Sequence, residues 1–456
     1  MAEEENNGGE NNDGIDRIST LSNSLLCHIL SFLPTKTSVH MSFVSRKWRN
    51  LWKNLEVFDF RDKCNEYSYQ APDDEFNEQF MLFTVFVNTV LSLRRSRVVR
   101  KFRLSSDHIP NNPLFAYSVD TWLSIAIGPH LQEFHLTLFT AGAFDNLPPT
   151  LFSCSNLISL SLSGYILLPL QDPLEICLPS LKVLQLLNMH HLNLSSMHIL
   201  LSACPVLENL ELFFSPESLD IIRVPSSLKR LKITVDNNVG AWLEIDAPGL
   251  KYLSLECITF RDAAAVGNLH SVEEAYLDVF PTPKSESVEP LLNLLRALSG
   301  IKHLELHNST TKKQWLFAAP ILNFPEFHYL LHLKLEYPPF NSTFLFDVLQ
   351  KCPMLETLIA FMFDIDMVDR SYDSLPSYRW EAKPKSVPKC LISHLTFIHF
   401  YGVPENELEF IGYVLQHGLV LKTMIIDEYW RDQPDRWMKK ISDLPRGSAM
   451  CQVKFL

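Results

Sequence analysis

Apolar residues recur at helical spacing near the amino end of the chain. One row repeats every four residues and holds Leu21, Leu25, Ile29 and Leu33. The adjoining row holds Leu26, Leu30 and Leu33. A stripe of this width predicts an amphipathic helix, which Pro34 is expected to end.

Two shorter helices are predicted after Pro34. Val39 and Phe43 lie one turn apart on the first, and Trp48, Leu51 and Trp52 at i, i+3 and i+4 make the apolar side of the second. A segment of about forty residues cannot bury two tryptophans alone. We therefore expect residues 16–60 to form a docking surface, its tryptophans included. The alternative is a small helical hairpin packed on its own downstream domain.

A different pattern, Leu-x-x-Leu-x-Leu, fills the body of the chain. Clear copies begin at residues 157, 181, 207, 228, 250, 301, 330 and 355, and weaker ones at 99, 131, 272, 395 and 421. Successive starts are mostly about 21 to 29 residues apart, which overlaps the period of leucine-rich repeats. The last two apolar positions are two residues apart, as on one face of a strand. The pattern predicts a solenoid of parallel strands.

Cysteines mark the repeats. Cys154, Cys204 and Cys352 each precede a strand leucine by three residues, and the stretches 195–203 and 343–351 have helical spacing before Cys-Pro, where proline ends a helix. We expect these cysteines to be small core residues at helix ends. All nine cysteines are scattered, without a C-x-x-C pair, so reduced thiols and no metal site are expected.

Length, charge and motif content limit the classes of function that this chain can have. The chain has 456 residues, more than one core usually holds, and a net charge of -12, which argues against nucleic-acid binding. No apolar run approaches a membrane span, and the start MAEEENNGGENNDG is unlike a signal peptide. We therefore expect a cytoplasmic and/or nuclear protein without a membrane partner. Phosphate-binding and hydrolase motifs are absent from the sequence, so no enzyme activity and no cofactor are expected.

Residues 16–60 resemble an F-box, the module that attaches a protein to a Skp-type adaptor in a cullin ubiquitin ligase. The match includes DRIS at 16–19, ILSFLPTK at 29–36 and Ser45. Ser22 stands where the family usually has proline, and serine can act as the N-cap instead. The resemblance implies that the F-box fold and adaptor interface comprise Leu21, Leu25, Leu26, Ile29, Leu33, Pro34, Val39, Trp48, Leu51 and Trp52.

The carboxyl end resembles the FBD domain that follows leucine-rich repeats in a large plant F-box family. The matching stretches are VPKCL at 387–391, LTFIHFYG at 395–402, LKTMII at 421–426 and the closing LPRGSAMCQVKF. His417-Gly418 stands where the family often has Asn-Ala. The expected α/β chain comprises a disordered acidic tail (1–14), a three-helix F-box (15–60), a linker and capping helix (61–96), leucine-rich repeats (97–363), a loop (364–386) and an FBD domain (387–456).

Residues flanking the strand leucines are expected to face the concave side, with helices and loops outside. They mix tyrosine, histidine and both charge signs, as a protein-binding groove does. The candidates are Arg230, Lys232, Tyr252, Glu274, Tyr276, Asp278, His303, Glu305, His307, His332, Lys334 and Glu336, and the row is expected to end at Phe361. A basic run, RRSRVVRK from Arg94, can be read as a nuclear address or an anion site, but a solvated helix end explains it with fewer assumptions.

The order of an F-box, leucine-rich repeats and an FBD-like end leads to one hypothesis. The resemblance implies a substrate-recognition subunit of a Skp–cullin–F-box ubiquitin ligase, with the F-box on the adaptor and an unknown target protein on the repeats. Two alternatives stay open: a co-receptor that needs a hormone or inositol phosphate, and an adaptor-bound F-box protein that acts outside the ligase.

Overall fold

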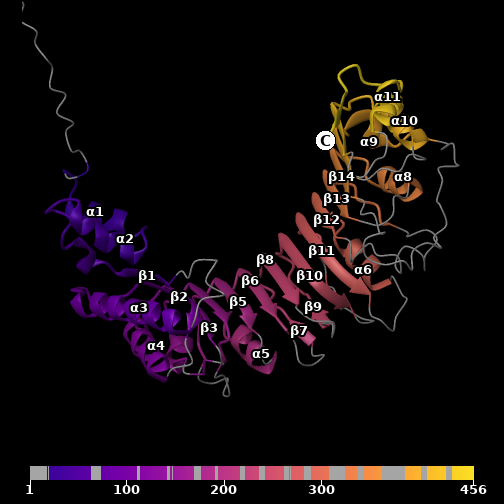
Figure 1. Cartoon of the computed structure of the whole chain (residues 1–456). Coiled ribbons are helices and arrows are strands. Elements are labelled where there is room, and N and C mark those ends of the chain that lie inside the picture. Colours follow the sequence, from indigo (N-terminus) through magenta and orange to yellow (C-terminus); the bar gives the residue numbers. More distant parts are fainter. Residues whose placement is uncertain are drawn as a thin grey trace, which may run out of the picture. The chain divides into compact units, whose positions relative to one another are not determined.

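The computed structural model divides the chain into two compact units, residues 1–141 and 142–456 (Figure 1). The described residues are 18, 20–62, 73–109, 113–140, 144–145, 147–168, 176–189, 194–215, 221–235, 242–260, 267, 269–281, 289–307, 324–336, 342–361, 386–401, 408–427 and 434–456. The expected acidic tail and nearly all of the expected loop at 364–386 lie outside these ranges, as does part of the linker.

The first unit joins short helices to a three-stranded parallel sheet. It opens with α1 (Asn23–Leu30), α2 (Thr35–His40) and the 3-10 helices η1 (Met41–Phe43) and η2 (Leu51–Asn54). Three strands follow, with one helix in each connection: β1 (Val57–Asp62), α3 (Asp73–Leu93), β2 (Lys101–Ile109), α4 (Pro113–Ala126) and β3 (Glu133–Thr140). β2 pairs in parallel with both β1 and β3.

The helix boundaries of the F-box differ from the prediction. α1 ends at Leu30 rather than Pro34, because the N–H groups of Phe32 and Leu33 bond carbonyls only three residues back, in tight turns. Pro34 instead precedes α2 as its N-cap. The third predicted helix is replaced by turns and the short η2. Ser22 does cap α1, since its Oγ accepts the N–H of Leu25 at 3.4 Å.

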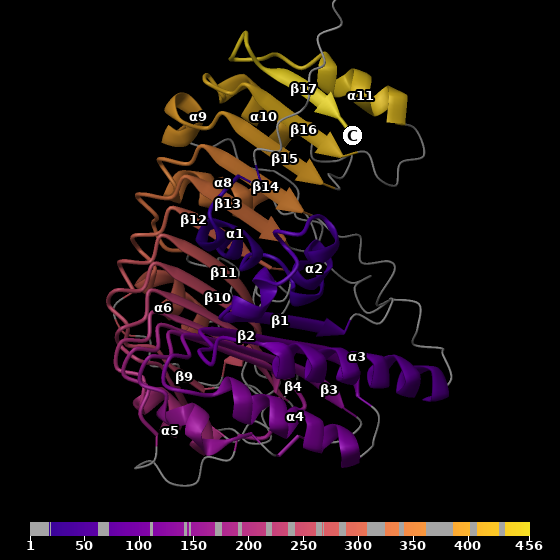
Figure 2. The ribbon, with the colours of Figure 1, turned by 90° about the vertical axis from the view of Figure 1, so that its left-hand side faces the viewer.

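The second unit is one long parallel sheet with helices on its convex side (Figures 1 and 2). Its strands, in spatial order, are β4 (Ser159–Gly164), β5 (Val183–Met189), β6 (Asn209–Phe214), β8 (Arg230–Val235), β10 (Tyr252–Phe260), β11 (Glu274–Pro281), β12 (His303–Leu306), β13 (His332–Glu336), β14 (Thr357–Phe361), β15 (Phe397–Tyr401), β16 (Thr423–Asp427) and β17 (Gln452–Phe455). β7 (Ile221–Arg223) and β9 (Trp242–Glu244) form a separate parallel pair.

Helical segments occupy many of the connections between these strands. They are η4 (Pro149–Ser153), α5 (Leu194–Ser202), α6 (Glu289–Ala297), α8 (Ser342–Lys351), α9 (Lys389–Ser393), α10 (Leu408–His417) and α11 (Pro434–Ser442). The α/β solenoid predicted from the repeats is therefore confirmed. None of the described helices, in either unit, is long and apolar enough to cross a membrane.

The repeat leucines build the core as predicted. Leu207, Leu210 and Leu212 are all at most 2% exposed, while the alternating Asn209 and Glu211 point to the other face. The expected core cysteines fit this scheme. Cys204 is buried, its thiol donates to the carbonyl of Leu200 at 3.1 Å, and its own carbonyl accepts the N–H of Leu207. The turn into β6 is thus tied to the end of α5.

The carboxyl end continues the same ladder. Thr357 of β14 is the register partner of Phe397 in β15, and Phe397 is that of Thr423 in β16. The segment that resembles an FBD domain therefore adds strands to the solenoid, whereas the boundary expected near residue 387 stays a prediction.

Candidate functional site

The first candidate surface is a set of large apolar side chains that the F-box leaves in solvent. Leu25 and Ile29 of α1 are 51% and 41% exposed, and Phe32 in the turn after it is 74% exposed. Phe43 of η1 and the adjacent Val44 are 87% and 63% exposed. We call these five residues the exposed apolar set. Such exposure within so short a segment is typical of a docking surface.

The tryptophans, in contrast, are core residues. Trp48 and Trp52 are 2% and 7% exposed, and Leu51 is 5% exposed. The prediction that they await a partner is wrong. Their burial is explained by η2, which carries Leu51 and Trp52 and packs on α1 and α2. The expectation from about forty residues did not allow for this packing.

The other predicted F-box residues divide between core and surface. Leu26 is fully buried, and the remaining four are partly buried: Leu21, Leu33, Pro34 and Val39. The docking prediction therefore rests on the exposed apolar set, of which only Leu25 and Ile29 were among the predicted interface residues. Phe32, Phe43 and Val44 were not among the predicted residues, although Phe32 lies inside the matched ILSFLPTK stretch.

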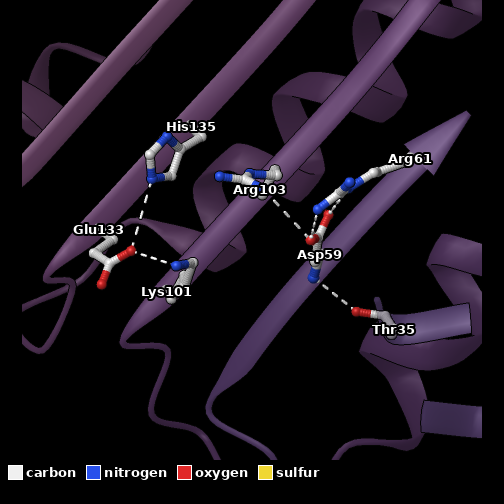
Figure 3. Close-up of polar contacts among 7 residues, drawn as sticks. All are labelled: Thr35, Asp59, Arg61, Lys101, Arg103, Glu133 and His135. Carbon is white, nitrogen blue, oxygen red and sulfur yellow. Dashed lines mark hydrogen bonds and ion pairs between the residues drawn. The ribbon is translucent and has the colours of Figure 1, made fainter. Parts of the chain in front are cut away.

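A polar cluster fastens the F-box to the sheet of its own unit (Figure 3). The hydroxyl of Thr35 at the start of α2 accepts the backbone N–H of Asp59 in β1 at 2.7 Å. The Asp59 carboxylate accepts hydrogen bonds from Arg61 at 2.6 and 2.8 Å, and Arg103 of β2 lies 3.8 Å away. The alternative of a helical hairpin packed on its downstream strands is thus partly correct, yet the exposed apolar set stays uncovered.

Neighbouring side chains in the same view form a second polar cluster on β2 and β3. Glu133 lies 2.5 Å from Lys101 and 3.7 Å from His135 (Figure 3). Burial lowers the pKa of His135, and the positive charges of Arg103 and Lys101 lower it further. Its imidazole is therefore mainly neutral near pH 7. These residues tie strands together rather than leaving charges for a ligand.

The basic run from Arg94 begins where α3 ends. Arg100 pairs with Glu56 at 2.7 Å, so part of the run has a structural role. Burial lowers the pKa of Arg94, and the nearby charge of Arg97 lowers it too. The position of Arg94 directly after Leu93 agrees with a helix end, where cations are favoured.

The second candidate surface is the strand face of the second unit. Its predicted residues form three rows across neighbouring strands. The first row holds Arg230, Tyr252, Glu274, His303 and His332, and the second holds Lys232, Tyr276, Glu305 and Lys334. The third row holds Asp278, His307 and Glu336, which ion-pair distances bring together. All twelve thus share one face, as predicted, and their role in target binding stays a prediction.

Charges on this face are largely paired with one another. The Lys232 ammonium lies 3.1 Å from Glu256 and 4.0 Å from Glu211. Lys334 lies 3.2 Å from Glu305 and 3.4 Å from Glu336. Burial tends to lower the pKa of Lys334, but the hydrogen bond and charge of Glu305 outweigh it and raise the pKa above its ordinary value. Both lysines are therefore held charged and cross-link adjacent strands.

Histidines complete the rows. His307 lies between two carboxylates, 3.1 Å from Asp278 and 2.9 Å from Glu336. His303 and His332 stack with ring centroids 4.6 Å apart. Burial and the adjacent His303 charge lower the pKa of His332. Burial, followed by the charge of Asp278, raises the pKa of Tyr276, so its phenol stays neutral.

The face extends further than predicted. The sequence-based row stopped at Phe361, but Phe397, His399 and Tyr401 of β15 continue it, with Phe361 and Tyr401 in register. The missed signal was the alternation in FIHFY, where Ile398 and Phe400 are fully buried and the residues between them face outward.

Catalytic chemistry has little support among the described residues. Burial raises the pKa of the Cys204 and Cys390 thiols to about 12, which keeps them protonated and poorly nucleophilic. Within the same part of the chain, no group of three His, Cys, Asp or Glu side chains is arranged to hold a metal ion.

Comparisons with known proteins agree with this architecture. The family model described as the At1g61320/AtMIF1 LRR domain matches residues 90–449, and the F-box domain model matches residues 18–60. The Arabidopsis thaliana F-box/FBD/LRR-repeat protein At1g13780 is 27% identical over 96% of this chain and 98% of its own. F-box/FBD/LRR-repeat protein At4g26340 is 28% identical over 97% and 100%, and F-box/LRR-repeat protein 13 is 27% identical over 97% of each, both from the same plant.

Proposed function

The chain belongs to the family of leucine-rich-repeat proteins that carry an F-box, and on that premise we propose that it is the substrate-recognition subunit of a Skp–cullin–F-box ubiquitin ligase. Its F-box docks the Skp-type adaptor, and the strand face of the second unit binds a target protein. Proteins of this family are generally adaptors without catalytic activity. The contribution of this chain is proximity, because holding target and transferred group together lowers the entropic barrier to their reaction.

The exposed apolar set carries this proposal. Burying an apolar side chain of this size contributes about 1.5 to 3 kcal/mol. Five partly exposed side chains therefore favour association by roughly 5 kcal/mol or more before the costs of binding. Because the tryptophans are already packed inside, the folded F-box offers these side chains to an adaptor without unfolding.

Adaptor binding can be measured with the full chain and a purified Skp-type adaptor. Ile29→Ser with Phe43→Ser is expected to weaken binding at least about a hundredfold, since both side chains would be central contacts. Leu419→Ser with Met450→Ser is the matched control, because these side chains are also exposed, by 51% and 72%, but lie in the second unit. Equal effects of the two pairs, or no binding by the wild type, would contradict the proposal.

Cullin recruitment is a separate step of the same proposal. Affinity purification from plant cells is expected to recover the adaptor and a cullin together, and to lose both in the Ile29→Ser, Phe43→Ser variant. Recovery of the adaptor without a cullin would instead favour the alternative of an F-box protein acting outside the ligase.

The co-receptor alternative has less support. An anionic hormone or inositol phosphate needs cations that are free to bind it, yet Lys232 and Lys334 are each paired with two carboxylates. Arg230 lies over the Tyr252 ring, 4.1 Å from its centroid. A thermal shift of the purified chain with inositol hexakisphosphate is therefore expected to be negligible.

We also propose that the protein works in the cytoplasm or nucleus. The cysteines among the described residues are all free thiols, which suits a reducing compartment. Imaging of a fluorescent fusion in plant cells tests this, and accumulation in the secretory pathway would contradict it.

A further inference from the structure

Positive charges gather in two segments of the first unit. Residues 46–53, RKWRNLWK, hold four lysines and arginines, and residues 94–101, RRSRVVRK, hold five, with no aspartate or glutamate in either. These two short segments thus carry nine of the 40 lysines and arginines of a chain whose net charge is -12. So uneven a distribution of charge indicates a surface that binds an anionic segment.

The two segments lie side by side in the fold. The backbone N–H of Arg95 donates to the carbonyl of Lys53 at 2.7 Å, and the N–H of Arg100 donates to the carbonyl of Glu56 at the same distance. The end of the F-box and the connection from α3 to β2 therefore form one basic region, although about forty residues separate them in sequence.

Neighbouring carboxylates neutralise only part of this region. Glu56 pairs with Arg100 at 2.7 Å, and Glu133 pairs with Lys101 (Figure 3). Five further side chains reach solvent and form no ion pair within the described part of the chain: Arg46, Arg49, Lys53, Arg95 and Arg97. We call these five residues the basic set. Its four arginines are exposed and its lysine is partly buried.

An acidic segment precedes the F-box in the same chain. Residues 1–14, the acidic tail, contain no lysine or arginine and hold five carboxylates: Glu3, Glu4, Glu5, Glu10 and Asp13. The chain enters the F-box next to the basic set, because the Lys47 ammonium donates to the carbonyl of Leu21 at 2.6 Å. Eight residues separate Asp13 from Leu21, a span of up to roughly 26 Å when extended. The acidic tail can therefore reach the basic set.

We propose that the basic set binds the acidic tail of its own chain. Five carboxylates then face five cations, and the covalent connection gives the tail an effective concentration of about 1 mM around them. Each exposed ion pair is weak, so the contact depends on their number and on ionic strength. An acidic partner has to displace the tail before it can use this surface. The inference is independent of adaptor docking.

The probe is a fluorescein-labelled peptide of residues 1–14, titrated with full-length chains and followed by fluorescence polarisation. In the neutral-tail variant, the attached tail loses its charges through Glu3→Gln, Glu4→Gln, Glu5→Gln, Glu10→Gln and Asp13→Asn. The peptide is expected to bind this variant at least about fivefold more tightly than the wild type, whose own tail competes. Equal binding to the two chains, or no binding to the variant, would overturn the inference.

A matched variant controls for the change in net charge. It also removes five exposed carboxylates, but from the second unit, through Glu274→Gln, Glu326→Gln, Glu356→Gln, Glu409→Gln and Asp443→Asn. Because distant charges are screened at physiological ionic strength, its affinity for the peptide is expected to stay within about twofold of the wild type. A gain as large as that of the neutral-tail variant would attribute the effect to net charge and contradict the proposed contact.

Variants of the basic set locate the contact. In the neutral-tail background, the combined changes Arg46→Gln, Arg49→Gln, Arg95→Gln and Arg97→Gln are expected to weaken peptide binding at least about tenfold. The control removes four exposed cations of the second unit, through Lys389→Gln, Lys422→Gln, Lys439→Gln and Lys440→Gln, and should change binding less than about twofold. Similar losses in the two variants, or full binding without the four arginines, would show that the basic set is not the site.

Discussion

The exposed apolar set of the F-box and the strand face of the second unit solve different binding problems. Phe43 is 87% exposed and has no polar group to pair. On the strand face, Lys232 and Lys334 are each engaged with two carboxylates before any partner arrives. A partner that covers the exposed apolar set gains the free energy of apolar burial. A partner that binds the strand face has to replace existing ion pairs with new ones.

This difference suits the two proposed partners. Apolar burial is non-directional, so the F-box set can hold a constant partner with little demand on geometry. Polar contacts add selectivity, because a wrong partner leaves desolvated charges without compensation. A face whose charges are already paired therefore suits the proposed role of selecting among targets.

The largest expected effect separates the F-box core from its exposed set. Trp48→Ala is expected to destabilise the first unit by about 3 to 5 kcal/mol, because it leaves a cavity where a 2% exposed side chain was packed. Phe43→Ala should change stability by less than about 0.5 kcal/mol, since that ring is in solvent. Urea denaturation measures both, and equal destabilisation by the two changes would remove the distinction between core and exposed set.

An intermediate effect is expected where the F-box is fastened to its sheet. Thr35→Val removes the acceptor for the partly buried N–H of Asp59 while keeping the shape of the side chain. The cost should be about 1 to 3 kcal/mol, and the Asp59 amide should exchange faster with deuterium. Thr37→Val is the control in the same helix, because Thr37 is exposed. A Thr35→Val protein as stable as this control would show that the bond does not fasten the F-box.

The smallest effect is expected on the paired strand face. Glu256 accepts hydrogen bonds from Thr234 at 2.9 Å and Ser254 at 3.1 Å, and pairs with Lys232. Since these groups stay partly in water, Glu256→Gln should cost less than about 1 kcal/mol.

The sign of its pH dependence follows from the pKa. Burial acts to raise the pKa of Glu256, but the hydrogen bonds of Lys232 and Thr234 outweigh it and leave the pKa lowered. Because the pKa of this carboxyl is lower in the folded chain than in the unfolded chain, its ionisation stabilises the fold at pH values above the unfolded-state pKa of about 4.3. This contribution is lost as the pH falls through the pKa of the folded state. The stability difference between wild type and Glu256→Gln should therefore be present at about pH 6 and vanish in acid. A difference that grows in acid would contradict this assignment.

The sequence predicted the repeat core well, for a physical reason. In Leu207, Leu210 and Leu212 the spacing itself determines which side chains face inward, because alternate residues of a strand lie on opposite faces. The register of neighbouring strands then follows from the repeat, so the rows of the strand face could also be predicted.

The F-box surface was harder to predict because helical spacing identifies an apolar helix face but not the elements that pack against it. Trp48 and Trp52 have the spacing of an apolar helix face, yet η2 is a short 3-10 helix packed against α1. Their burial depends on how η2 packs on α1 and α2, which spacing along the sequence does not show. The outward rings of β15 were missed for a related reason. Tyr401 is separated from Phe361 by forty residues in sequence, of which 362–385 lie outside the described ranges, but the two are neighbours in the sheet.

The most direct test of the account is hydrogen–deuterium exchange of the full chain with and without a Skp-type adaptor. The adaptor is expected to slow exchange at residues 23–32 and 41–44, which carry the exposed apolar set, and to leave β8 to β15 unchanged. Protection confined to the strand face, or no protection in the F-box at adaptor saturation, would contradict the claim that the F-box docks the adaptor.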